Sequence, residues 1–158
     1  MKVLIPWYSR TGTVERLVAL AREALAEAGH EVTAERLVPE VDLPYPLWLL
    51  LSFVPGARSP LRNPPETEGY DRCLLALPKW TLACPPVNAF LDGRRLPPTA
   101  LLVACGGWDH ERYTTELVDR LTAAEIEVLG SLAVKQRRVA DGSAEAEVRA
   151  FLARCFPA

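Results

Sequence analysis

Hydroxyl side chains are concentrated where a strand-like run gives way to a helical pattern. Residues 8–15 read Tyr-Ser-Arg-Thr-Gly-Thr-Val-Glu and carry hydroxyls at three positions after the tyrosine: Ser9, Thr11 and Thr13. Gly12 permits a tight turn, and the helix that begins there offers unpaired backbone N–H groups and a positive dipole end. Such a loop suits a phosphate monoester, with Arg10 offsetting part of its charge. The alternative is an ordinary helix N-cap, where Ser and Thr are favoured anyway.

Two later loops each bring a tryptophan to the end of a strand-like run. Residues 77–80 read Leu-Pro-Lys-Trp, and residues 105–108 read Cys-Gly-Gly-Trp. Aromatic faces and backbone groups at such positions are suited to holding a flat, partly apolar ring. The alternative is that Trp80 and Trp108 only cover the edge of the core, and Tyr113 is the rival aromatic residue in the second loop.

The hydrophobic pattern predicts strands and helices in alternation. Strands are expected at 2–7, 31–37, 73–77, 99–105 and 126–134, and helices at 14–28, 85–91, 111–124 and 143–154. This alternation predicts an α/β fold, a three-layer sandwich around a five-stranded parallel sheet of order 2-1-3-4-5. Ligands bind such a sheet beyond the carboxyl ends of its strands, where the strand order reverses, so the phosphate loop and the tryptophan loops are expected to meet there.

Residues 39–69 interrupt this rhythm. Seven prolines fall between Pro39 and Pro65, around the apolar run 47–54. The segment is too long for a simple connection, so we expect a single domain over 1–158 with an irregular Pro-rich insertion that holds a short helix near 46–54. The apolar run is far shorter than the ~20 residues that span a bilayer, which favours a buried or capping segment over attachment to a membrane or partner surface.

Composition excludes several classes of function. A net charge of −2 and a pI near 5.7 disfavour nucleic-acid binding, which usually needs a clustered basic face. Four cysteines without a C-x-x-C pair and only two histidines argue against a zinc site. No leader pattern precedes the first strand-like run, so we expect a cytoplasmic protein with reduced thiols.

Residues 8–13 resemble the FMN-phosphate signature of flavodoxins, which reads hydroxyl residue, any residue, Thr, Gly, any residue, Thr. Ser9, Thr11 and Gly12 match it, whereas Val14 stands where a Thr is usual and Thr13 lies beside it. Residues 70–80 followed by 85–91 are similar to the family stretch "YD…GSPVW…PPV..FL", and residues 103–107 resemble the end of the next family strand. The resemblance implies a flavodoxin-like fold and a bound FMN. It places the phosphate at Ser9, Arg10, Thr11, Gly12, Thr13 and Val14, and the ring at Pro78, Lys79, Trp80, Gly106, Gly107 and Trp108.

The resemblance also implies a redox role. Two roles are open: electron transfer to a redox partner protein, or NAD(P)H- or quinone-linked reduction of a small molecule, with residues 39–69 shaping a pocket or a homodimer contact. Neither requires a catalytic side chain, because the chemistry belongs to the cofactor. Lys79 is expected to stabilise an anionic reduced flavin. The alternative is a flavodoxin-like interaction module that has lost FMN, which Val14 and the Ala76-Leu77 pair in place of Gly-Ser favour.

Other chemistries of this sheet order lack their residues. The first loop has no Cys for a low-molecular-weight phosphatase, and Leu77-Pro78 stand where a response-regulator receiver needs an Asp. Asp109 and His110 are expected to form a solvated helix start rather than a proton relay. Cys84 and Cys105 are expected to be buried, inert thiols.

Overall fold

The central sheet is parallel and has the predicted strand order. The computed structural model describes residues 1–107 and 109–158. Five strands pair in the order β2-β1-β5-β6-β7, which confirms the expected 2-1-3-4-5 arrangement. Their bounds are β1 Lys2–Trp7, β2 Glu31–Arg36, β5 Arg72–Pro78, β6 Thr99–Cys105 and β7 Val128–Lys135. A second sheet consists of two short antiparallel strands, β3 Val38–Pro39 and β4 Leu61–Arg62.

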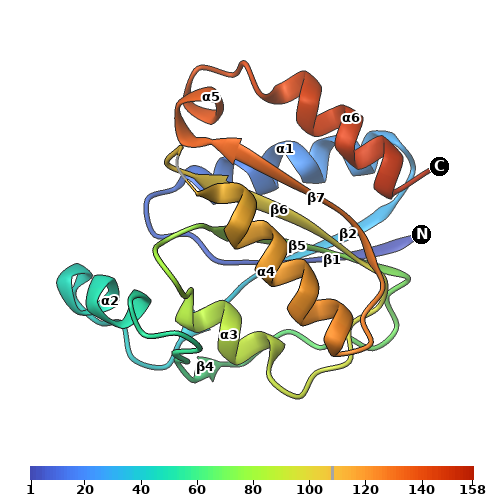
Figure 1. Ribbon diagram of the computed structural model, residues 1–158. Helices are drawn as coiled ribbons and strands as arrows, with labels where there is room; N and C mark the ends of the chain where they lie inside the picture. Colours follow the sequence, from blue (N-terminus) through green and yellow to red (C-terminus); the bar gives the residue numbers. More distant parts are fainter. Residues whose placement is uncertain (108) are drawn as a thin grey trace.

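Helices cover both faces of the sheet and complete three layers (Figure 1). On one face lie α1 (Thr13–Glu27), α5 (Gln136–Ala140) and α6 (Glu145–Cys155), and on the other lie α3 (Pro85–Leu91) and α4 (His110–Ala123). Alternate residues of the buried strands enter opposite cores, as the pleat requires. Leu102 of β6 thus joins the core under α1 and α6, whereas Leu101 and Val103 join the core under α3 and α4.

The segment between β2 and β5 contains one helix, α2 (Tyr45–Ser52). In Figure 1 it lies at the left of the molecule, clear of the two helical layers and on the side to which the arrowheads of the sheet point. Prolines mark its start, with Pro44 at the N-cap and Pro46 in the first turn, where a missing N–H costs nothing. Only Trp48 and Ser52 of this helix are buried. The predicted short helix near 46–54 is present and ends at Ser52.

Two predicted elements near the C-terminus have different bounds. The last strand begins at Val128 rather than at residue 126. Glu125 has a left-handed φ of 59°, which ends the turn after α4 and directs the chain to the buried Ile126 before the strand begins. The helix expected at 143–154 runs from Glu145 to Cys155, and α5 was missed altogether. A turn with Gly142 at φ 77° separates the two helices.

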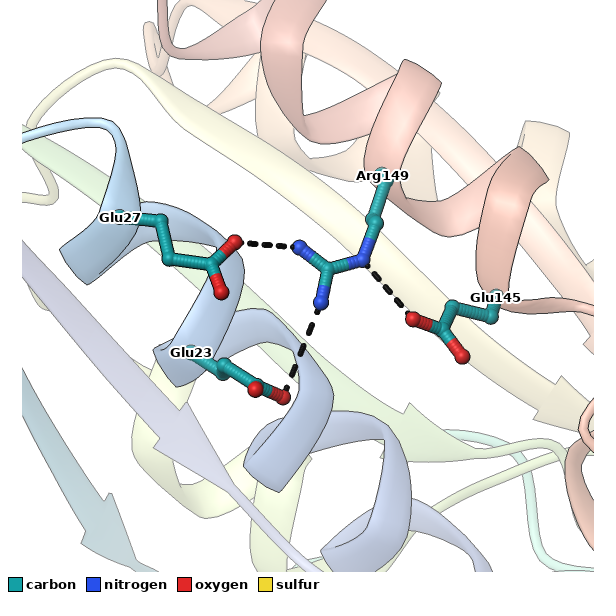
Figure 2. A network of polar contacts seen from close by, with 4 residues as sticks. All are labelled: Glu23, Glu27, Glu145 and Arg149. Carbon is teal, nitrogen blue, oxygen red and sulfur yellow. Dashed lines mark hydrogen bonds and ion pairs between the residues drawn. The ribbon is translucent and has the colours of Figure 1, made fainter.

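A charged network joins α6 to α1 (Figure 2). The guanidinium of Arg149 lies 2.7 Å from a carboxylate oxygen of Glu27 and 3.7 Å from one of Glu23, both on α1, and 3.0 Å from Glu145 on its own helix. Exposed ion pairs contribute little one by one, so this network orients α6 on a contact that the apolar core already provides. Among the residues described, no helix is long and apolar enough to cross a membrane.

Removing a core side chain from the central sheet tests the packing. Leu102 in β6 is completely buried, so Leu102→Ala leaves a cavity and is expected to lower the free energy of unfolding by about 2–5 kcal/mol. Val41→Ala is the matched control, because Val41 is 63% exposed and its truncation is expected to change stability by less than about 0.5 kcal/mol. Urea unfolding measures both, and equal losses would contradict the assignment of the core.

Two buried thiols make the stability of the fold vary with pH in the alkaline range. Burial raises the pKa of Cys73 and of Cys84 from 9.0 to about 12. The folded state therefore holds these protons after the unfolded chain has lost them, so their contribution is complete below about pH 9 and is lost between about pH 9 and pH 12. We expect the urea midpoint to fall over that range, and to fall less in a Cys73→Ala/Cys84→Ala variant. Parallel pH profiles for the two proteins would refute this account.

Candidate functional site

The loop between β1 and α1 leads directly into the N-terminus of the helix. Gly12 adopts a left-handed φ of 83°, a conformation that a residue with a Cβ rarely takes. The backbone N–H of Gly12 donates to Ser9 Oγ at 3.1 Å, which closes the turn. No side chain caps the first turn of α1. The hydroxyl oxygens of Thr11 and Thr13 lie 3.5 Å apart, so two hydroxyl groups lie together at this helix start.

Arg10 connects this loop to α2. Its guanidinium lies 3.3 Å from Asp42 Oδ1 and 5.8 Å from the centre of the Tyr45 ring. Asp42 also accepts from Trp48 Nε1 at 3.4 Å. The charge of Arg10 is thus shared with a carboxylate that is largely exposed, and it remains at the edge of the loop.

The loop after β5 is built around an aromatic cluster. The Trp80 ring lies edge-on to the buried Tyr8 ring, with centroids 5.5 Å apart, and 6.1 Å from the Trp48 ring of α2. The backbone N–H of Lys79 donates to Ala104 O at 2.7 Å, which continues the pairing of β5 with β6 into the loop. Burial raises the pKa of the Tyr8 hydroxyl, so it is protonated at neutral pH.

One cavity of about 320 Å³ joins the two loops at the carboxyl ends of β1, β5 and β6. Its lining includes most of the predicted site residues: Ser9, Arg10, Thr11, Thr13, Val14, Pro78, Lys79, Trp80 and Gly106. The remaining lining comes from Tyr45, Leu49, Thr81, Ala104 and Gln136. The cavity therefore has a polar end at α1 and an aromatic side at Trp80 and Tyr45.

Some lining residues were not predicted from the sequence, and they differ in how strongly the sequence indicates them. Ala104 and Gln136 lie at the end of β6 and just after β7, so the rule that ligands bind beyond the carboxyl ends of strands was a usable signal for them. Tyr45 and Leu49 belong to α2, whose all-apolar run has no face that a periodicity would identify.

Several predicted residues lie elsewhere. Gly12 and Gly107 flank the cavity in sequence but do not line it, and Trp108 lies outside the described residues. Ala76 and Leu77 are completely buried in the two cores. The structure places His110 in a separate cavity between α4 and β7, and Tyr113 in another beside α3.

A larger cavity of about 410 Å³ lies on the β2 side of the same loop. It shares Ser9 and Arg10 but contains no residue of the loops after β5 and β6. The smaller cavity is the better candidate site, because it alone of the two combines the phosphate loop with the aromatic loop.

The described lining of the cavity contains hydroxyl, aromatic and basic side chains. The lining residues described include no Asp, Glu, His or Cys. Burial raises the pKa of Cys105, next to the lining residue Ala104, so this thiol is a protonated and poor nucleophile at neutral pH. Across the described residues, no group of three His, Cys, Asp or Glu is placed to hold a metal ion. The cavity thus combines a hydroxyl-rich end at the uncapped start of α1, a buried lysine and a flat aromatic surface.

Known structures share this architecture. A "putative flavoprotein" from Bacteroides eggerthii superimposes with a TM-score of 0.73 at 18% identity, over 96% of this chain and 95% of that one. The two-electron reduced flavodoxin of Megasphaera elsdenii gives a TM-score of 0.59 at 16% identity, over 96% and 98% of the two chains. At these identities the likeness shows the fold.

Sequence comparison adds a nearer relative. No family model matches the chain. An uncharacterized protein from Archaeoglobus fulgidus is 34% identical over 111 residues, which cover 68% of each chain. The chain therefore belongs to the same family as the Archaeoglobus fulgidus protein and has a flavodoxin-like fold.

Proposed function

We propose that this protein binds one FMN in the cavity at the carboxyl ends of β1, β5 and β6 and acts as a redox protein. The observation that carries the proposal is that one cavity combines an uncapped helix start rich in hydroxyls with an aromatic loop. Its volume of about 320 Å³ falls in the range of small-molecule sites. The fold places this cavity where α/β sheets of this order bind ligands.

The residues present fit the two chemically different ends of FMN. Ser9, Thr11 and Thr13 donate hydroxyl protons to the phosphate together with the first amides of α1, and Arg10 offsets part of its charge. Trp80 provides a flat surface for the ring. The cofactor, when bound, supplies the electron-transfer chemistry. The chain binds and orients it, and its buried side chains set its electrostatic surroundings.

Trp80 and Lys79 have opposite effects on the reduction potential of the flavin ring. The indole of Trp80 is electron-rich and disfavours added negative charge on a stacked ring, which lowers the reduction potential. Lys79 is buried in the lining, and its ammonium favours negative charge, which raises the potential. The balance between these two neighbouring residues tunes the site.

Of the two redox roles, reduction of a small acceptor is the better supported. The net charge of −2 is weak for a shuttle that docks through strong acidity. Tyr45 and Leu49 of α2 give the cavity an apolar wall, which suits an uncharged molecule beside the ring. A cytoplasmic location and a small-molecule or protein redox partner belong to this proposal.

The second candidate is a flavodoxin-like interaction module that has lost FMN. Val14 favours it, because a valine side chain lines the cavity where the flavodoxin signature has a hydroxyl. Ala76 and Leu77 do not add to that argument, since both are buried in the cores and neither lines the cavity. Colour separates the candidates: the purified FMN protein is yellow, whereas the module is colourless and does not take up added FMN.

FMN and riboflavin titrations test the phosphate loop. Thr11→Val/Thr13→Val removes two hydroxyl donors to a charged group, each worth about 1.5–3 kcal/mol, so FMN affinity is expected to fall by about 100-fold or more. Riboflavin lacks the phosphate, and its affinity is expected to stay within about threefold. Thr122→Val, an exposed threonine on α4, is the matched control and changes neither. Equal losses for FMN and riboflavin would place the phosphate elsewhere.

Potentiometry tests Lys79. Removing the ammonium by Lys79→Ala is expected to lower the midpoint potential of the bound flavin by on the order of 30–60 mV, because negative charge on the reduced ring loses a buried partner. Lys2→Ala, at the opposite end of β1, is the control and leaves the potential unchanged. A Lys79→Ala protein with the wild-type potential would remove Lys79 from this role.

A further inference from the structure

The exposed apolar surface of this protein is gathered at α2. Of the large hydrophobic side chains exposed in the described residues, all except Met1 lie between residues 38 and 54 or at Leu82. We define the α2 patch as six of these side chains that lie on α2 or next to it: Tyr45, Leu47, Leu50, Phe53, Val54 and Leu82. Leu50 is 68% exposed and Phe53 is 58% exposed. Contiguous apolar surface of this kind marks an interaction site.

The lack of charged residues in the patch restricts the kind of partner that binds there. Residues 43–57 contain no Asp, Glu, Lys or Arg. The nearby Arg10 and Arg58 are each paired with a carboxylate, that of Asp42 at 3.3 Å and that of Asp92 at 2.8 Å. An anionic lipid surface is bound by free basic residues on a helix, and transient protein partners are steered by charge. The α2 patch offers neither.

We infer that the α2 patch is the interface of a two-fold symmetric dimer of this chain. In a two-fold interface each patch faces a copy of itself, so a charged patch would oppose like charges. A neutral apolar patch meets no such repulsion and is complementary to its own copy. The side chains of Leu47, Leu50 and Phe53 would then be covered by the same side chains of the second copy.

Contacts at both ends of α2 connect this interface to the cavity. At the C-terminal end, Ser52 Oγ lies 2.7 Å from Thr81 Oγ1, and Ser52 O accepts from the backbone N–H groups of Leu82 and Ala83, each at 2.9 Å. In the middle, Trp48 contacts Trp80. At the N-terminal end, Arg10 of the phosphate loop contacts both Asp42 and Tyr45.

These contacts link dimerisation to ligand binding. A second copy that orders α2 also orders Trp80 and Arg10, so cofactor and partner copy are expected to favour each other's binding reciprocally. This coupling rests on the proposed function. The interface itself does not, because it follows from the exposed side chains alone.

Analytical ultracentrifugation of the full chain without flavin tests the interface. The wild type is expected to be a dimer at micromolar concentration. Leu50→Glu and Phe53→Glu each place like charges opposite one another and are expected to give monomers with an unchanged circular dichroism spectrum. Ala19→Glu, which adds the same charge to the exposed face of α1, is the matched control and stays dimeric.

Three results would overturn the interface: a monomeric wild type at every concentration, a Leu50→Glu protein that remains dimeric, or a monomeric wild type that sediments with phosphatidylcholine vesicles. FMN titration tests the coupling, and the affinity of the Leu50→Glu monomer is expected to fall by about fivefold or more. Equal affinities would overturn the coupling. A dimer that binds no FMN leaves the interface standing and refutes the proposed function, so the two failures are distinguishable.

Discussion

The candidate site depends on the left-handed turn at Gly12. Because this residue has a φ of 83°, the chain leaves β1 and enters α1 without a side chain to cap the helix, and Ser9 Oγ closes the turn on the Gly12 N–H. No side chain caps the first turn of α1, and Thr13 and Val14 of that turn line the cavity. An L-residue with a side chain would be strained in the same conformation, so the turn that brings the hydroxyl-rich loop into α1 depends on one glycine.

The aromatic side of the cavity has a different origin. Trp80 is held between Tyr8, which leaves β1, and Trp48, which comes from α2. The sheet core therefore positions one side of this tryptophan, and a helix outside the layers positions the other. Since α2 buries only Trp48 and Ser52, the two residues that reach the loop after β5 are also the ones that fix the helix. The segment that interrupts the strand–helix alternation thus belongs to the candidate site.

In the proposed function, the scaffold and the cofactor have separate roles. The two cores under the helices keep the strand ends in place, and the lining described contains no Asp, Glu, His or Cys. Hydroxyl and aromatic side chains in this lining are the features on which the proposed FMN binding rests. Tyr45 belongs both to the cavity lining and to the α2 patch, so a partner on that surface and a ligand in the cavity act on one element.

Residue patterns along the chain determined the fold, the strand order and much of the cavity lining. Strands buried on both faces are continuous apolar runs, α1 and α4 have apolar residues at helical spacing, and the turn at residues 9–13 is rich in hydroxyls, so all of these are local signals. The strand order follows because right-handed crossovers leave few alternatives. The place of Tyr45 and Leu49 in the site was decided only by the tertiary structure. An apolar helix without a polar face contains no periodicity that says what it packs against, and the contacts of Asp42 and Ser52 that place it join residues distant in the chain.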